Sequence, residues 1–325
     1  MAEIFLQLAA IETKAQSHLS LIQNYYHDDE ILGKEYLVRP IPHAAPLIFG
    51  QISRKWRAVA LSTPGLWNSI SLKCTDEEME DNISLYNTWL QRSGVLSLSF
   101  QFYRPIDSPR DVSPKFVDDC QILFRTILPH AKRWRSVDLK NFPASSYQAP
   151  HDLLPNSALV LETLSVSYDW REQPVSTPWV GLCTAPKLRL LYFDHIDRAN
   201  IMVGGEWPTF PWSQLTHIDV GDCSAYDCLQ ILSEALTAVA CQFVVQRPSF
   251  LQHPPISHPG LQTLKIEVYN TGLPVWNLLT CPTLSTLSVE ARTYPIPDYR
   301  FSNSSFLPTS LYYGAVLPVP YSRLL

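Results

Sequence analysis

The sequence lacks the features that mark several large classes of protein. It has no basic excess, since the net charge is -5 and the pI is about 6.0, so the counterion release that drives nucleic-acid binding is not expected. No apolar run approaches the ~20 residues that span a bilayer, and Glu3 stands where a signal peptide has basic residues. We therefore expect a soluble intracellular protein, cytoplasmic or nuclear, with no nucleic-acid or membrane partner.

Paired cysteines and catalytic signatures are also absent. The seven cysteines are odd in number and include no Cys-x-x-Cys pair, which favours small buried hydrophobes over a disulfide framework or a zinc site. Gly-x-Ser-x-Gly, His-Glu-x-x-His, the P-loop and Gly-x-Gly-x-x-Gly do not occur. The sequence thus predicts a protein that is not an enzyme and that holds no cofactor or metal.

What the sequence does contain is a repeat. The pattern Leu-x-x-Leu-x-(apolar) occurs clearly five times and more weakly twice, and the 27 prolines cut the chain into short elements. The clear copies are Leu161/Leu164/Val166, Leu188/Leu191/Phe193, Leu215/Ile218/Val220, Leu261/Leu264/Ile266 and Leu284/Leu287/Val289; the weak copies are Trp134/Val137/Leu139 and Leu236/Val239/Cys241.

The spacing of these copies predicts the fold. The third apolar positions (139, 166, 193, 220, 241, 266 and 289) are 27, 27, 27, 21, 25 and 23 residues apart, within the 20–29 residues of leucine-rich repeats. Each copy reads as a strand, and helix-like stretches lie between, at Tyr226–Leu236 and Leu273–Leu279. We expect an α/β solenoid with a curved parallel sheet. A doubly wound or barrel enzyme is the alternative. It is disfavoured because such folds need glycine-rich turns and the chain has only 11 glycines.

The first 130 residues read as helices with short strands. One helix is predicted over residues 46–62, with Ile48, Ile52, Trp56 and Ala60 on one face and Pro64 ending it. A second is expected to open at Thr75 in a capping box with Glu78 and to end at Gly94. A strand at 96–102 and a third helix capped by Ser113 complete a region expected to seal the first repeat.

The N-terminal segment resembles a known family. Ala45-Pro46-Leu47-Ile48, Ile52-Ser53-Arg54-Lys55-Trp56-Arg57 and Ala60 to Trp67 resemble the second half of an F-box, and Met1 to Leu6 is similar to its earlier helix. Residues 89–94, 133–136 and 211–217 add to a likeness to F-box-like proteins with leucine-rich repeats, of the type expanded in mushroom-forming (basidiomycete) fungi. The resemblance implies binding to a Skp-type adaptor and, through it, a cullin complex. The residues it implicates are Ile4, Phe5, Leu47, Ile52, Arg54, Trp56, Leu66 and Trp67.

These observations divide the chain into three parts. Residues 1–72 form an F-box-like helical region, 73–291 a repeat solenoid with capping helices, and 292–325 an irregular proline-rich tail. The expected function is that of a substrate-recognition subunit of an SCF-type ubiquitin ligase. The Leu-Pro start of an F-box is missing and about 35 residues separate its two helices. A scaffold or sensor with a decayed F-box is therefore the alternative.

The side chains between the buried leucines are the candidate partner contacts. In a leucine-rich unit these positions point out of the concave face, and charge mixed with aromatics suits a protein partner. They are Asp138, Lys140, Tyr192, Asp194, His217, Asp219, Lys265, Glu267 and Glu290. A solvated face without a ligand accounts for them equally well. A hydrolase built from Cys223, His217 and Asp219 is the remote alternative, because a Cys at that position is typical of repeat turns.

Overall fold

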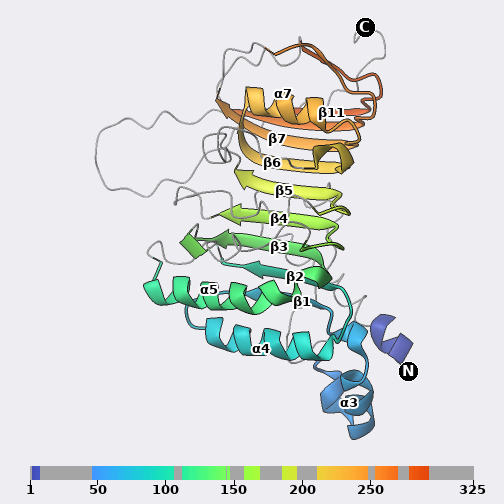
Figure 1. Cartoon of the computed structure of the whole chain (residues 1–325), viewed down its shortest axis with the longest axis vertical. Helices are drawn as coiled ribbons and strands as arrows, with labels where there is room; N and C mark the ends of the chain where they lie inside the picture. The colour runs from blue at the N-terminus through green and yellow to red at the C-terminus, as the bar shows by residue number, and fades with distance from the viewer. Residues whose placement is uncertain are drawn as a thin grey trace. The chain divides into compact units, whose positions relative to one another are not determined.

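The computed structural model describes residues 2–7, 46–105, 112–143, 145–146, 157–168, 185–195, 211–247, 253–269 and 278–292. The protein is α/β and is dominated by a nine-stranded sheet in the order β1-β2-β3-β4-β5-β6-β7-β9-β11 (Figure 1). Every pairing with an established register is parallel. The strands are β1 (Ser69–Lys73), β2 (Leu98–Tyr103), β3 (Trp134–Phe142), β4 (Thr163–Tyr168), β5 (Leu190–His195), β6 (His217–Ser224), β7 (Ala240–Arg247), β9 (Thr263–Tyr269) and β11 (Thr286–Arg292).

The chain divides into two compact units. Unit 1 comprises Met1–Leu190 and Pro208–Pro211, and unit 2 comprises Leu191–Trp207 and Trp212–Leu325. Unit 2 also holds a small parallel pair of strands, β8 (Ile256–Ser257) and β10 (Leu279–Thr280). The boundaries expected after residues 72 and 291 stay predictions, and the tail beyond Arg292 lies outside the described residues.

The repeated apolar positions stack in register. Leu139 faces Val166 across β3 and β4, and Ile266 faces Val289 across β9 and β11. Most of these side chains are fully buried, and each such burial stabilises the fold by ~1.5–3 kcal/mol. A parallel sheet that includes the seven predicted strands is therefore confirmed, and its apolar rows are buried except at β11, where Val289 is 36% exposed.

One predicted copy was wrong by two residues. Cys241 pairs with Ile218 and Leu264, so it is the second apolar position of its repeat, and Phe243 is the third, facing Val220 and Ile266. Leu236, taken as the first position, is 48% exposed, and Ala238 is buried in its place. With Phe243 substituted, the spacings become 27, 27, 27, 23, 23 and 23. The first two apolar positions of this copy are Ala238 and Cys241, whose small side chains give too weak a hydrophobic pattern to place the repeat correctly from the sequence.

Each repeat has a further buried position, three residues before its first apolar position, that the sequence analysis did not identify. Its carbonyl accepts a hydrogen bond from the N–H three residues on, for example Leu161 N–H to Ala158 O at 3.2 Å and Leu284 N–H to Cys281 O at 3.2 Å. This turn leads into the strand, and the side chain of its first residue, which is small or planar, is buried. The buried residues there are Ala131, Ala158, Ala185, Trp212, Ala235, His258 and Cys281.

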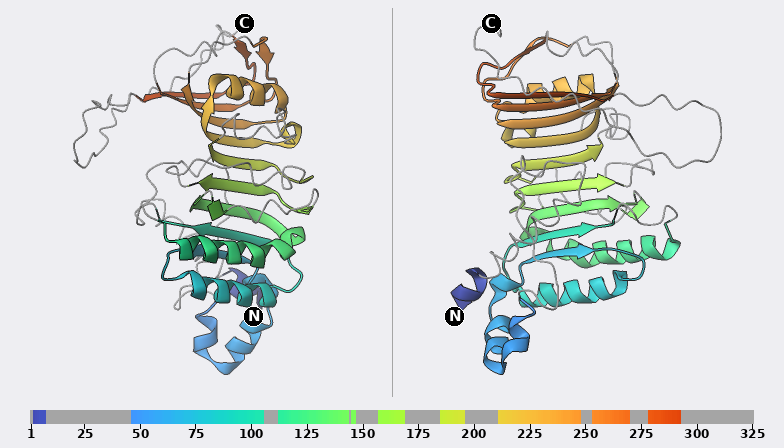
Figure 2. Two further views of the ribbon diagram at one scale, coloured as in Figure 1. Left: turned by 60° about the vertical axis from the view of Figure 1, so that its left-hand side comes forward. Right: turned by 180° about the vertical axis from the view of Figure 1, so that it is seen from behind.

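Two long helices cover one face of the first strands of unit 1 (Figure 2). In α4 (Met79–Arg92), Tyr86 meets Phe100 and Phe102 of β2 edge-on, at 6.0 and 5.2 Å between ring centroids. In α5 (Pro114–Ile127), Phe116 stacks on Phe142 of β3 at 6.4 Å. Trp89 and Asn82 of α4 donate to main-chain carbonyls of β1. The region expected to seal the first repeat thus includes two strands of the same sheet.

The local signals in this region were partly confirmed. Ser113 caps α5 by accepting from Phe116 N–H at 3.0 Å, and Gly94, at φ 59°, follows the end of α4 as predicted. The capping box at Thr75 was wrong. Its hydroxyl donates to the Glu78 carboxylate at 2.9 Å instead of bonding to the main chain, and the helix starts four residues later, at Met79.

The helix predicted over residues 46–62 is broken. It forms α2 (Phe49–Ile52) and α3 (Arg54–Leu61), separated by Ser53 in an extended conformation. The Ser53 hydroxyl accepts from Trp56 N–H at 3.2 Å and so starts a new helix, a role serine favours at an N-cap. The predicted stripe is consequently not one buried face, since Ile52 is 54% exposed while Phe49 is buried. As expected, α3 ends before Pro64, which begins the short 3-10 helix η1 (Pro64–Leu66).

Unit 2 confirms one of the two helices predicted between repeats. Helix α7 (Ala225–Glu234) lies against β6 and β7 and begins with a capping box between Ser224 and Asp227 (Figure 2). The other, predicted at Leu273–Leu279, falls mostly outside the described residues; Leu279 itself is in β10.

A hydroxyl bridge between neighbouring repeats leads to a stability prediction. Thr237 Oγ1 lies 2.7 and 2.9 Å from the carbonyls of Ser213 and Leu215, and Thr283 Oγ1 lies 2.8 and 3.0 Å from those of Pro259 and Leu261. The same position in the repeat between them is Gly260. A Cβ there would sit 3.5 Å from Leu236 O and 3.7 Å from Ala238 O.

We therefore expect Gly260→Thr to raise the free energy of unfolding by about 1 kcal/mol, through one hydrogen bond and a less flexible unfolded chain. Urea denaturation measures it, with Thr283→Gly as the matched control that lowers stability. An unchanged or lower midpoint for Gly260→Thr would show that the bridge is not transferable between repeats.

Candidate functional site

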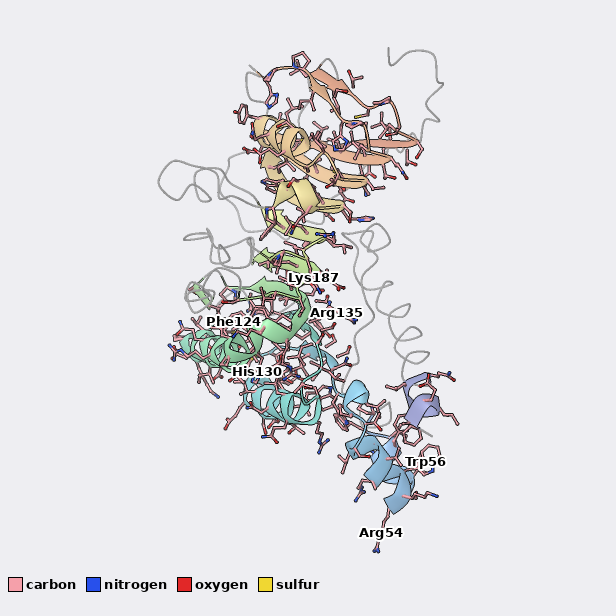
Figure 3. All side chains as sticks on the ribbon, turned by 45° about the vertical axis from the view of Figure 1, so that its right-hand side comes forward. Arg54, Trp56, Phe124, His130, Arg135 and Lys187 are labelled. Carbon is pink, nitrogen blue, oxygen red and sulfur yellow. The ribbon has the colours of Figure 1, made fainter. Side chains whose placement is uncertain are left out.

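Residues 2–7 form a short helix that packs against α2 and α3. Phe5 is fully buried, stacks on Phe49 at 4.3 Å between ring centroids and meets Trp56 at 4.6 Å. Figure 3 shows Trp56 between α3 and this first helix, with Arg54 pointing away from both. The two pieces of sequence that resemble an F-box therefore come together around three aromatic rings. We call the structure formed by residues 2–7, α2 and α3 the N-terminal cluster.

The eight predicted adaptor-binding residues fall into three groups. Ile4, Ile52 and Arg54 are exposed; Leu47 and Trp56 are half-buried; Phe5, Leu66 and Trp67 are buried. Trp67 belongs to the interior of unit 1, where its indole N–H donates to Ala60 O at 2.8 Å and its ring meets Trp89 at 4.8 Å. Phe5, Leu66 and Trp67 are buried, so they can support a binding surface but cannot contact a partner directly.

The exposed part of the N-terminal cluster is apolar and basic. Ile4 and Ile52 are 56% and 54% exposed, and Leu61, which the sequence analysis did not single out, is 44% exposed. Arg54, Lys55 and Arg57 are exposed as well. Exposed large aliphatic side chains are candidates for contact with another protein.

The predicted partner-binding residues lie on the sheet face opposite the apolar rows. The residue between the second and third apolar positions of each repeat forms a set that we call the polar row: Ser71, Gln101, Asp138, Ser165, Tyr192, Asp219, Gln242, Lys265 and Ser288. Lys140, Glu267 and Glu290 lie two residues further along their strands, and His217 two residues earlier. The side chain of Asp194 lies outside the described residues.

Exposure of the polar row was overestimated from the sequence. Asp138, Tyr192 and Asp219 are only 6%, 5% and 4% exposed, and Glu267 is 3% exposed. The alternation along a strand shows which face of the sheet a side chain is on, but not how much of that face is covered. Among the predicted partner-binding residues, Lys140, His217, Lys265 and Glu290 are half-buried and remain accessible.

In unit 1 the polar row is internally bonded. Ser71 Oγ donates to Gln101 Oε1 at 2.8 Å, and Gln101 Nε2 donates to Asp138 Oδ2 at 2.6 Å. Lys140 Nζ lies 3.7 Å from the same carboxylate oxygen. The amide oxygen and the amide nitrogen of Gln101 are therefore both hydrogen-bonded, and these bonds link side chains of β1, β2 and β3.

In unit 2 the row is arranged differently. Asp219, Gln242 and Lys265 are register neighbours on β6, β7 and β9. Lys265 Nζ lies 3.6 Å from Glu267 and 3.8 Å from Glu290, so the ammonium turns toward the carboxylates of the next row. Gln242 is 1% exposed, and neither its amide oxygen nor its amide nitrogen has a hydrogen-bond partner. Sequence reasoning passed over Gln242 because it sought charged and aromatic residues.

The hydrolase alternative gains no support from these positions. His217 Nδ1 lies 3.0 Å from Thr216 Oγ1, and desolvation lowers the pKa of His217. Cys223 is buried, at 3% exposure. No group of three or more residues suited to hold a metal occurs in the part of the chain that the structure describes. That the protein is not an enzyme stays a prediction.

No family model, curated protein or solved structure matched this chain in the three comparisons made. Among the helices of the described ranges, none combines the length and the apolar character that crossing a bilayer requires.

The described cysteines give a prediction about reactivity. Six are buried and form no disulfide: Cys74, Cys120, Cys223, Cys228, Cys241 and Cys281. Burial raises the pKa of Cys281 to about 11 and raises the pKa of Cys74, Cys120, Cys228 and Cys241 further. A thiol whose pKa is raised stays protonated near neutrality, and the protonated form is a poor nucleophile.

We expect at most one thiol per native chain to react rapidly with a disulfide reagent at about pH 8, and all seven to react in urea. The absorbance of the released thiolate counts them. Two or more rapidly reacting thiols in the native protein would contradict the burial of this set.

Proposed function

We propose that this chain is a protein-interaction module, a substrate-recognition subunit of an SCF-type ubiquitin ligase. The N-terminal cluster binds a Skp-type adaptor, and the repeat face holds a protein partner for ubiquitin transfer. In this role the chain is a leucine-rich-repeat solenoid that performs no chemistry itself. The adaptor brings the cullin complex, and that complex carries out the transfer.

The observation that carries the proposal is the exposed aliphatic surface of the N-terminal cluster. Ile4 and Ile52 are each more than half exposed, although their own helices bury Phe5 and Phe49 against Trp56. Fully burying an isoleucine stabilises an assembly by ~1.5–3 kcal/mol. Two such residues, together with the exposed Leu61 of α3, suit an apolar groove on an adaptor.

The repeats support the second half of the proposal. Their regular spacing fixes a row of polar side chains on one sheet face, and Lys140, His217, Lys265 and Glu290 keep part of their surface accessible. A rigid sheet carrying charges of both signs can orient a protein partner by complementary charge. Because the row contains no reactive thiol or arranged catalytic group among its described members, binding is the activity it suits best.

A scaffold without adaptor binding is the second candidate. It is favoured by the burial of Phe5, Leu66 and Trp67, three residues that the F-box resemblance implicates and that here belong to the interior. In that case the aromatic cluster serves only to close the first end of unit 1, and the repeat face alone binds a partner.

Adaptor binding is tested with the double variant Ile4→Glu/Ile52→Glu. Both side chains are exposed, so the fold is retained, while two carboxylates placed in an apolar contact weaken it by about a hundredfold or more. The measurement is the Kd for a purified Skp-type adaptor by calorimetry, with circular dichroism to confirm folding.

The matched control is Val95→Glu, at an aliphatic residue that is 91% exposed in the loop between α4 and β2. We expect it to bind as tightly as the unchanged chain. Absence of binding by the unchanged chain, or equal binding by all three proteins, would reject the adaptor role and leave the scaffold.

A further inference from the structure

The turns that lead into the strands carry many charges in unit 1 and none in unit 2. We define the entry segment of a repeat as the five residues that start at the buried position three residues before its first apolar position. The entry segments of unit 2 are 212–216, 235–239, 258–262 and 281–285, and they contain no Lys, Arg, Asp or Glu. The repeats therefore stack without any need for these charged side chains at the entry.

Three entry segments of unit 1, at 131–135, 158–162 and 185–189, are strongly basic. Their cations are Lys132, Arg133, Arg135, Lys187 and Arg189, and their one acid is Glu162. Their summed charge is 5 − 1 = +4, although the net charge of the whole chain is −5. Because the matching turns of unit 2 are uncharged, the packing of the repeats does not account for this concentration of cations.

The three basic segments lie side by side and form what we call the entry edge of unit 1. Glu162 N–H donates to Arg135 O at 2.8 Å, and Arg189 N–H donates to Glu162 O at 2.9 Å. Main-chain bonds of this kind hold neighbouring segments about 4.8 Å apart. Figure 3 shows Lys187 and Arg135 near one another at this edge. The cations therefore act together on anything that approaches it.

The two lysines of the entry edge can be reached by a partner. Lys132 and Lys187 are both exposed, and neither ammonium forms an ion pair with a described residue. Arg133 has a structural role instead, because its guanidinium donates to Ser93 Oγ at 2.7 Å and to Leu96 O at 2.8 Å. It thereby holds the turn before β2 against the entry edge. The lysines are the cations available for binding.

Exposed aliphatic side chains accompany these lysines. Val95 is 91% exposed in the turn that Arg133 holds, and Leu159 is 46% exposed in the segment between the two that carry the lysines. In the order of β2, β3, β4 and β5, the turns are therefore aliphatic, cationic, aliphatic and cationic. A segment with both carboxylates and apolar side chains complements such a surface.

Charge favours a short acidic peptide over a larger polyanion. The rest of the chain carries −5 − 4 = −9. A membrane or a long nucleic acid extends beyond the entry edge and meets this negative charge, whereas a short peptide stays within the ~8 Å over which charges act at physiological ionic strength. Phosphate groups also leave the aliphatic side chains of the edge without an apolar contact.

From these observations we propose that the entry edge of unit 1 binds an acidic peptide segment of a partner protein. The carboxylates of the segment meet Lys132 and Lys187, and its apolar side chains contact Val95 and Leu159. This inference goes beyond the proposed function, which places a partner on the polar row of the sheet face, and it does not depend on adaptor binding.

The test begins with a displayed library of short random peptides selected on the unchanged full-length chain. We expect the selected sequences to be enriched in aspartate and glutamate together with leucine, isoleucine or valine. A synthetic selected peptide should bind Lys132→Gln/Lys187→Gln about tenfold more weakly, because two charge contacts are lost. Leu159→Ser should also weaken binding, and the Kd should rise with salt. Fluorescence anisotropy of the labelled peptide measures each Kd.

The matched control is Lys73→Gln/Lys115→Gln. These two lysines of unit 1 are also exposed, but they lie at the end of β1 and in the first turn of α5. Both double variants change the net charge by the same amount and alter only exposed side chains, so circular dichroism should show an unchanged fold. The control should bind the peptide as tightly as the unchanged chain. An equal loss in both double variants would show an effect of overall charge and overturn the inference.

The remaining outcomes identify what the entry edge binds. Selection of no peptide, selection without acidic residues, or equal binding to Lys132→Gln/Lys187→Gln and the unchanged chain overturns the acidic-peptide site. Lysine-dependent binding of single-stranded oligothymidine, or of vesicles made of equal parts phosphatidylserine and phosphatidylcholine, also overturns it if no acidic peptide is selected. Acidic-peptide binding by a chain that fails to bind the Skp-type adaptor supports the site and rejects the ligase role.

Discussion

Parallel main-chain pairing in a single register is the constraint on which the rest of the structure depends. When β9 lies against β11 with Leu264 opposite Leu287 and Ile266 opposite Val289, apolar side chains meet apolar side chains and the residues between them meet each other. A slip of one residue would turn every side chain to the other face of the sheet. The turn three residues before the first apolar position, with its buried residue and, at Ala158, Ala185, Trp212, Ala235 and Cys281, its hydrogen bond, helps to fix where the strand begins and so the register.

The same constraint produces the polar row. Once Cys241 and Phe243 are committed to the core, Gln242 must face the other way, between Asp219 and Lys265. Its position is thus a consequence of packing on the opposite face, but its chemical identity is not. Gln101 accepts from a hydroxyl on β1 and donates to a carboxylate on β3, whereas neither amide atom of Gln242 is paired, although Asp219 lies beside it in the register.

How far the sequence predicted the structure depends on how strong each local signal was. Copies with two leucines, such as Leu261/Leu264/Ile266, were placed correctly, because leucines at this fixed spacing give a strong hydrophobic signal. The copy built on Ala238 and Cys241 was misplaced, since small residues carry little of that signal and the nearby Leu236 is exposed. Ser53 broke a helix whose apolar spacing continued through it, because one hydroxyl at an N-cap outweighed periodicity. The deep burial of Asp138, Tyr192 and Asp219 was not predicted, because alternation along a strand fixes the face of a side chain but not what covers that face.

The identical 23-residue spacing of the last repeats has a consequence for how such a chain can change. The buried position recurs at Ala235, His258 and Cys281, and the repeats of Ala235 and Cys281 share the entry turn and the hydroxyl bridge as well. Duplicating or deleting one whole period in this stretch would keep the buried positions of neighbouring strands opposite one another, while the polar residues between them would change. Gene duplication or deletion can therefore lengthen or shorten this end of the protein by whole repeats. An insertion or deletion of any other length would misalign the buried rows.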